Sequence, residues 1–204
     1  MRRRTEATAI SLRQASWLLG LICLAVVLIA LGGEAVRLAL RYERAAILAG
    51  QYWRLVTGHL VHSSAAHLLL NLAGLGLIAG LFPKDYSLGQ WLLIMGFSLV
   101  FIDLGFVFYE PQLQWYVGFS GVLHGGLAAG AVAWWRHETK ALALALSVIF
   151  VVKLGWEQVQ GALPFSGDME VIVAAHLYGA MGGALAALSI WFRLQDWSPR
   201  APSL

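Results

Sequence analysis

The chain has 204 residues, of which 59% are hydrophobic and only 12% are charged. Soluble domains carry about 25% charged residues, so this chain has too little charge to cover a water-facing surface, and it is too apolar to be disordered. The net charge of +3 is small, and the basic residues form no face that would bind nucleic acid. The single cysteine, Cys23, argues against a disulfide or a cysteine-based metal cluster. The composition predicts an all-α membrane protein.

The chain begins with a short basic stretch, residues 1–14, ahead of an apolar run at 15–33 that is long enough to cross a bilayer. A basic start before an apolar run also describes a signal peptide. This run is long for one, however, and no clear small-x-small cleavage site follows it. We therefore expect a retained first helix.

Residues 34–66 are expected to form an outer segment that lies at the membrane interface. Arg37, Arg41 and Arg44 recur at spacings of four and three, with apolar residues between them, which places them on one face of a helix. Further spans are expected at 67–82, 91–108, 118–135, 141–156 and 171–192, followed by a tail at 193–204. The whole chain, residues 1–204, is thus predicted to be a single six-helix bundle.

Six spans would place both termini on the same side of the membrane. The basic residues on that side outnumber those on the other, so the positive-inside rule predicts cytoplasmic termini. The inner side would hold Arg2, Arg3, Arg4, Arg13, Lys84, Arg136, Lys140, Arg193 and Arg200, and the outer side Arg37, Arg41, Arg44 and Arg54. The outer side would face the periplasm in a Gram-negative cell.

Polar residues are costly inside a bilayer, and three groups of them map to its outer half. The first is Ser120, which lies between Gly118 and Gly121 at the start of the fourth span. Glycines let other backbones approach closely, and the free amides at a helix start can stabilise an oxyanion, so Ser120 is a candidate nucleophile. The alternative is that these small residues serve only close helix packing.

The second group is His176, which is followed by a stripe of small residues at Gly179 and Gly183. A matching stripe begins at Gly121 on the fourth span, and close contact between the two stripes would bring His176 within hydrogen-bond reach of Ser120. No acidic residue near His176 in the sequence is suited to orient it, so the pattern predicts a Ser–His dyad rather than a triad. The alternative is a histidine that satisfies a polar bundle interior.

The third group is His67 with Asn71, which share one face at the start of the second span. Both side chains can donate hydrogen bonds, which suits an oxyanion hole that supplements the Ser120 amide. The alternative is a helix cap with polar packing. His59 and His62 lie just upstream and could line the same cavity or sit at the interface.

The motifs HLLLN at 67–71, GFSG at 118–121 and AHLYGAMGG at 175–183, in this order, resemble the rhomboid family of intramembrane serine proteases. Trp53 and Arg54 resemble the Trp-Arg pair common in the first outer loop of that family. The resemblance covers about residues 50–192.

The resemblance implies that Ser120 is the nucleophile and His176 the general base, with His67, Asn71 and the Ser120 backbone amide as oxyanion donors. It implies no cofactor and no metal. The partners would be membrane-anchored protein substrates within the lipid bilayer, and the active site would open to the periplasmic side of a bacterial inner membrane.

His124 departs from a common pattern, because many rhomboids carry a tyrosine four residues after the serine. With the short chain, this departure resembles the rhombosortase branch. That branch is associated with substrates that end in a Gly-Gly motif, a single transmembrane helix and a basic tail. His124 could pack on His176, contact substrate or itself act as the base.

Other classes of function stay open at this point. The chain could be a rhomboid protease with other substrates or an inactive rhomboid-like binding protein, and its acyl-enzyme could be resolved by water or by another amine. A metalloprotease is disfavoured because no HExxH motif occurs, and a transporter because no internal repeat is convincing.

Asp103 and Lys153 could pair with each other or snorkel. The loop at 158–170 is a plausible mobile cap.

Overall fold

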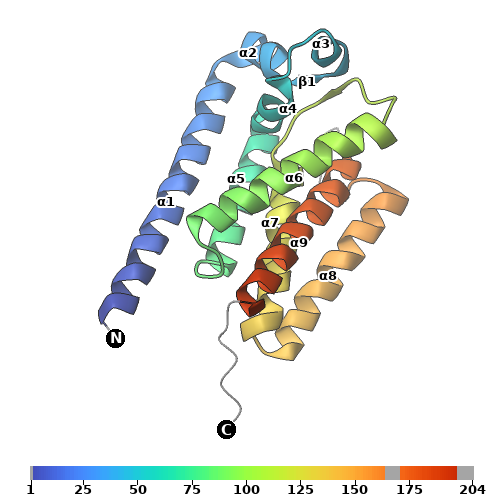
Figure 1. Cartoon of the computed structure of the whole chain (residues 1–204). Helices are drawn as coiled ribbons and strands as arrows, with labels where there is room; N and C mark the ends of the chain where they lie inside the picture. Colours follow the sequence, from blue (N-terminus) through green and yellow to red (C-terminus); the bar gives the residue numbers. More distant parts are fainter. Residues whose placement is uncertain (1, 164–170, 197–204) are drawn as a thin grey trace.

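The computed structural model of the chain describes residues 2–163 and 171–196. Its long helices lie where spans were expected. They are α1 (Arg2–Leu31), α5 (Ala65–Leu81), α6 (Leu88–Tyr109), α7 (Ser120–His137), α8 (Lys140–Gln160) and α9 (Val173–Asp196). In Figure 1, α1 and α8 stand at opposite edges of the bundle, α6 crosses in front, and α1 begins at the same end of the bundle where α9 finishes.

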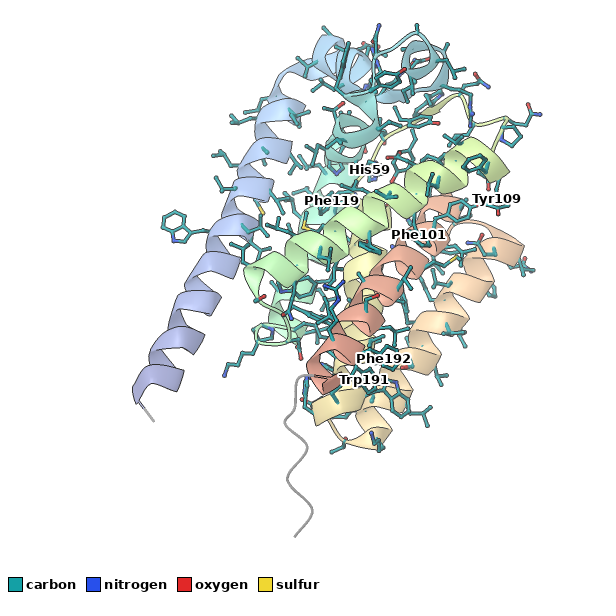
Figure 2. The ribbon with its side chains drawn as sticks, viewed as in Figure 1. His59, Phe101, Tyr109, Phe119, Trp191 and Phe192 are labelled. Atoms are coloured by element: carbon teal, nitrogen blue, oxygen red, sulfur yellow. The ribbon has the colours of Figure 1, made fainter. Side chains whose placement is uncertain are left out.

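Three helices in the described part of the chain are long and apolar enough to cross a membrane by themselves, namely Leu88–Tyr109, Lys140–Gln160 and Val173–Arg193. The number rises to five if two bent pairs each form one span; these are Trp17–Leu31 with Gly33–Leu40, bent by 116°, and Arg54–Leu60 with Ala65–Leu81, bent by 91°. Aromatic side chains lie near both ends of the bundle, as Tyr109 and Trp191 show in Figure 2. The protein is therefore a mostly helical membrane protein, while six spans and cytoplasmic termini remain predictions.

Helix α7 is the centre of the bundle, because α5, α6, α8 and α9 all pack against it. It is rich in glycine and alanine rather than in large apolar residues, half of its 18 residues are buried, and only the last two are exposed. Helix α7 can lie inside the membrane despite its low hydropathy, because neighbouring helices rather than lipid cover much of its surface.

The predicted close approach of α7 and α9 is confirmed. A Cβ on Gly179 would overlap the carbonyl group of Gly121, and a Cβ on Gly183 would overlap that of Gly125. A Cβ on Gly121 would in turn lie 2.8 Å from the Ala175 carbonyl oxygen. The backbones touch directly, which fixes the start of α9 against the start of α7.

Residues 34–66 fold into a plug of short elements, so the predicted helical face shared by three arginines is wrong, while the place of this segment at the membrane interface stays a prediction. These are α2 (Gly33–Leu40), β1 (Tyr42–Glu43), α3 (Arg44–Leu48), α4 (Arg54–Thr57) and η1 (Gly58–Leu60), and β1 pairs antiparallel with β2 (Trp115–Tyr116). The helix ends at Leu40, since Tyr42 extends into the strand and buries its ring against Phe106. Arg37, Arg41 and Arg44 therefore do not share a helical face.

Three of the arginines in this plug donate to backbone carbonyl groups, and Arg37 does so to that of Ser63 at 3.0 Å. Arg44 donates to the carbonyl oxygens of Phe106 and Glu110 at 2.6 and 2.7 Å, and Arg54 donates to that of Arg41 at 2.8 Å. Arg54 is buried, whereas the neighbouring Trp53 is exposed. The arginine of this pair thus stabilises the fold of the plug, and the tryptophan faces outward.

Candidate active site

The starts of α7 and α9 bring a serine and a histidine into contact. Ser120 is the first residue of α7, and its Oγ lies 3.0 Å from Nε2 of His176, in the first turn of α9. His176 is only 5% exposed. The glycine contacts between the two helices explain this distance, because no side chain separates the backbones there.

The loop before Ser120 is held in a conformation that only glycine adopts readily. Gly118 has φ +127°, and a Cβ at this position would lie 2.8 Å from Nε2 of His67. The Tyr116 hydroxyl donates to the Gly118 carbonyl oxygen at 2.6 Å. Burial raises the pKa of Tyr116, so this phenol stays protonated and keeps its hydrogen bond at neutral pH.

His67 and Asn71 lie on α5 and face the same cavity as Ser120. Ser64 caps α5 by accepting from the His67 backbone amide at 3.1 Å, and Nδ1 of His67 lies 3.0 Å from the Ser63 hydroxyl. The Asn71 side-chain amide donates one hydrogen bond to the His67 carbonyl oxygen at 2.9 Å. An amide nitrogen carries two hydrogens, so Asn71 keeps a second donor.

The cavity has a volume of about 300 Å³ and is lined by both polar and apolar residues. Its polar lining residues are His67, Asn71, Ser120, His124, Lys153, Glu157 and His176. The remaining walls are mainly leucines. Leu163 and Val171 also line it, but 164–170, the centre of the expected cap with Pro164, Gly167, Asp168 and Glu170, lies outside the described residues, so the cap stays a prediction.

The other two histidines upstream of α5 lie apart from Ser120. His59 is buried with Nε2 3.5 Å from an Asp103 carboxylate oxygen, and its ring packs edge-on against Tyr116. His62 packs edge-on against His67, with 5.0 Å between the ring centroids. Neither is among the residues that line the cavity.

Glu157 is the residue that the sequence analysis missed. We expected no carboxylate beside His176, and that expectation is wrong, because an oxygen of Glu157 lies 3.0 Å from Nδ1 of His176. Glu157 lies near the end of α8 and is 3% exposed. The sequence does not reveal this contact, since the two residues are 19 positions apart and lie on different helices. The only usable sign was that Lys153 and Glu157 share a helical face at i, i+4.

Lys153 pairs with Glu157 at 2.7 Å and not with Asp103. Its ammonium group also contacts Nε2 of His124, and the His124 ring stacks on that of His176 with centroids 3.9 Å apart and an angle of 11°. Nδ1 of His124 lies 2.7 Å from the Ser120 carbonyl oxygen. Of the three roles considered for His124, packing on His176 is the one that the geometry shows.

His124, Glu157 and His176 offer ligand atoms within 4.8 Å of one another, which is close enough for a metal ion. The Lys153 ammonium, however, contacts both His124 and Glu157 from within this cluster. The lysine thus supplies the positive charge that a metal ion would otherwise bring.

A profile of the Rhomboid domain matches residues 49–193. The chain is 27% identical over 138 residues to YdcA, a candidate rhomboid protease of Bacillus subtilis (strain 168). This match covers 67% of this chain and 66% of YdcA. It is 25% identical over 151 residues to the rhomboid protease GluP of the same organism, covering 72% of this chain and 28% of GluP. It is 26% identical over 182 residues to the rhomboid protease GlpG of Klebsiella pneumoniae, covering 84% of this chain and 61% of GlpG. The matches thus span between about a quarter and two thirds of these relatives.

Proposed function

Since the chain belongs to the rhomboid family of intramembrane serine proteases, we propose that it cleaves membrane proteins with Ser120 as nucleophile and His176 as general base. The observation that carries the proposal is the 3.0 Å distance between the Ser120 hydroxyl and Nε2 of His176, two residues that line the same cavity. A hydroxyl beside a neutral imidazole is the arrangement that activates a serine.

In this mechanism the Ser120 oxygen attacks a peptide carbonyl of the substrate while its proton moves to Nε2 of His176. The histidine then gives the proton to the leaving amine, and an acyl-enzyme remains. Water or another amine resolves the acyl-enzyme. The apolar walls of the cavity exclude bulk water, which strengthens the electrostatic contacts of the reacting atoms.

The developing oxyanion would be stabilised by the Ser120 backbone amide, by His67 and by the second hydrogen of the Asn71 amide. The Ser120 amide is free because it lies at the start of α7, where backbone N–H groups have no helical partner. Each such donor contributes on the order of 3 kcal/mol to transition-state stabilisation.

For the substrate class we propose a protein with a single C-terminal transmembrane helix preceded by a Gly-Gly motif, as in the rhombosortase branch. Two observations support this. The first is that His124 takes the place next to His176 where many rhomboids carry tyrosine. The second is that glycine weakens a helix, so a Gly-Gly motif would make the peptide carbonyl of a substrate helix accessible. We further propose that both termini are cytoplasmic and that the cavity opens toward the periplasm.

The test is cleavage in proteoliposomes of a reporter whose tail consists of Gly-Gly, an apolar helix and a basic end. The proposal predicts cleavage by the unaltered protein and by Ser189→Ala, a control serine that is half-buried on α9 and bonds to the Leu185 carbonyl oxygen, and none by Ser120→Ala. A second reporter with Leu-Leu in place of Gly-Gly tests the substrate class. The mass of the product separates hydrolysis from transfer to an added amine. Unchanged cleavage by Ser120→Ala would refute the proposed function.

A further inference from the structure

Glu157 is a buried carboxylate with partners on both sides. Its Oε2 atom accepts from the Lys153 ammonium at 2.7 Å and lies 3.0 Å from Nδ1 of His176. A carboxylate with so little solvent contact is costly unless it is paired and hydrogen-bonded. The chain supplies a charged partner in Lys153 and a hydrogen-bond partner in His176, although an apolar residue at this position would avoid the free-energy cost of burying a charge.

The partners of Glu157 fix which nitrogen of His176 carries a proton. An ionised carboxylate can only accept hydrogen bonds, so Nδ1 of His176 must be the donor. A neutral imidazole with a protonated Nδ1 presents a lone pair at Nε2. That lone pair faces the Ser120 hydroxyl, which is the tautomer that a general base needs.

The hydrogen-bond partners of His124 fix its protonated nitrogen in the same way. Its Nδ1 faces the Ser120 carbonyl oxygen, which can only accept, so Nδ1 is the donor and Nε2 is the acceptor. The Lys153 ammonium donates to that Nε2 and to Glu157. Every hydrogen bond from Ser120 through His176, Glu157 and Lys153 to His124 thus has a donor and an acceptor, with no conflict.

We propose that Glu157 is a positioning residue that turns the Ser120–His176 pair into a Ser–His–Glu triad, with Lys153 keeping the carboxylate ionised. This inference rests on the proposed function. In the acylation step the Ser120 O–H bond breaks and its proton moves to Nε2 of His176, so the ring becomes an imidazolium. Glu157 keeps its charge and accepts from Nδ1 throughout, which holds the ring orientation and stabilises the imidazolium.

The experiment compares Glu157→Gln with Glu157→Asp. Glutamine keeps the size of the side chain but loses the charge and can present an N–H to Nδ1, which favours the wrong tautomer. For Glu157→Gln we expect the kcat of reporter cleavage and the rate of fluorophosphonate labelling to fall by about 10²–10⁴-fold, as for loss of the acidic member of a triad. The KM should change little. Aspartate keeps the charge on a shorter side chain, so Glu157→Asp should be more active than Glu157→Gln.

The control is Glu138→Gln, which removes an exposed carboxylate beyond the end of α7 and should leave activity unchanged. Thermal unfolding in detergent is measured for each variant. A merely structural glutamate would give the opposite order, with the isosteric glutamine at least as active as aspartate, and that result would overturn the triad. Labelling of the unaltered protein but not of Ser120→Ala shows that the proposed function holds whichever order is found.

Discussion

At the residue scale, Gly118 is where the backbone constrains the site most tightly. Its positive φ and the His67 ring against its Cα leave no room for a side chain. Gly118→Ala should therefore cost about 1–3 kcal/mol in backbone strain and displace His67. We expect cleavage to fall more than about 10-fold, measured as kcat/KM in proteoliposomes, and Gly76→Ala on α5, where a Cβ meets nothing within 4 Å, is the control. Equal activity of the two variants would contradict this role of Gly118.

Asn71 provides a second prediction at this scale. If its free amide hydrogen binds the oxyanion, it acts only in the transition state, so Asn71→Ala should lower kcat by about 10²–10³-fold with KM little changed. Gln112→Ala, which removes an exposed amide in the loop between α6 and β2, should change neither constant. A rise in KM at constant kcat would instead assign Asn71 to substrate binding.

The motifs around Ser120, His176, His67 and Asn71 could be found from the sequence, because each keeps its polar residues at fixed spacing from glycines or from one another within a single element. Glu157 could not be found in this way. Its contact with His176 depends on how α8 is rotated relative to α9, and that rotation leaves no local pattern in the sequence. A helix on its own predicts only the pairing of Lys153 with Glu157.

At the element scale, the contact of α7 with α9 sets the geometry of the site. The stripes of small residues predicted this contact, since a side chain on either stripe would collide with the backbone of the other helix. The six long helices also follow from their apolar runs. The fold of residues 34–66 does not, because the β1–β2 pairing and the carbonyl groups bound by Arg44 bring together segments far apart in the sequence.

Gly183→Ala tests the helix contact. The added methyl group would overlap the Gly125 carbonyl group, and overpacking of this kind costs about 1–3 kcal/mol. The variant should unfold at a lower temperature in detergent and lose activity. Gly155→Ala on α8 is the matched control, because a Cβ there meets nothing within 4 Å and alanine favours a helix, so its melting temperature should not fall. Equal melting of both variants would contradict the close contact.

At the scale of the whole molecule, low charge and long apolar runs predicted a helical membrane protein, and the described helices agree with that class. Orientation is a separate prediction, because it depends on the basic residues outside the bundle and not on its packing. The exposed Tyr52 lies in the outer segment and Lys140 at the start of α8, near the opposite end of the bundle.

The lone Cys23 makes this orientation testable. In a Cys23→Ser background, a maleimide that enters the periplasm but not the cytoplasm should label Tyr52→Cys in intact cells. It should label Lys140→Cys only after the inner membrane is permeabilised. Solubilised protein, in which both sites should react, is the control for accessibility. The reverse pattern in intact cells would contradict cytoplasmic termini.

The central claim is that Ser120, next to His176, is an activated nucleophile. The most direct measurement is peptide mapping by mass spectrometry after the folded protein reacts with a fluorophosphonate in detergent. We expect a covalent adduct on Ser120 that forms much more slowly in His176→Ala and is absent from Ser120→Ala. An adduct on a different residue, or an adduct on Ser120 that forms equally fast without His176, would contradict it.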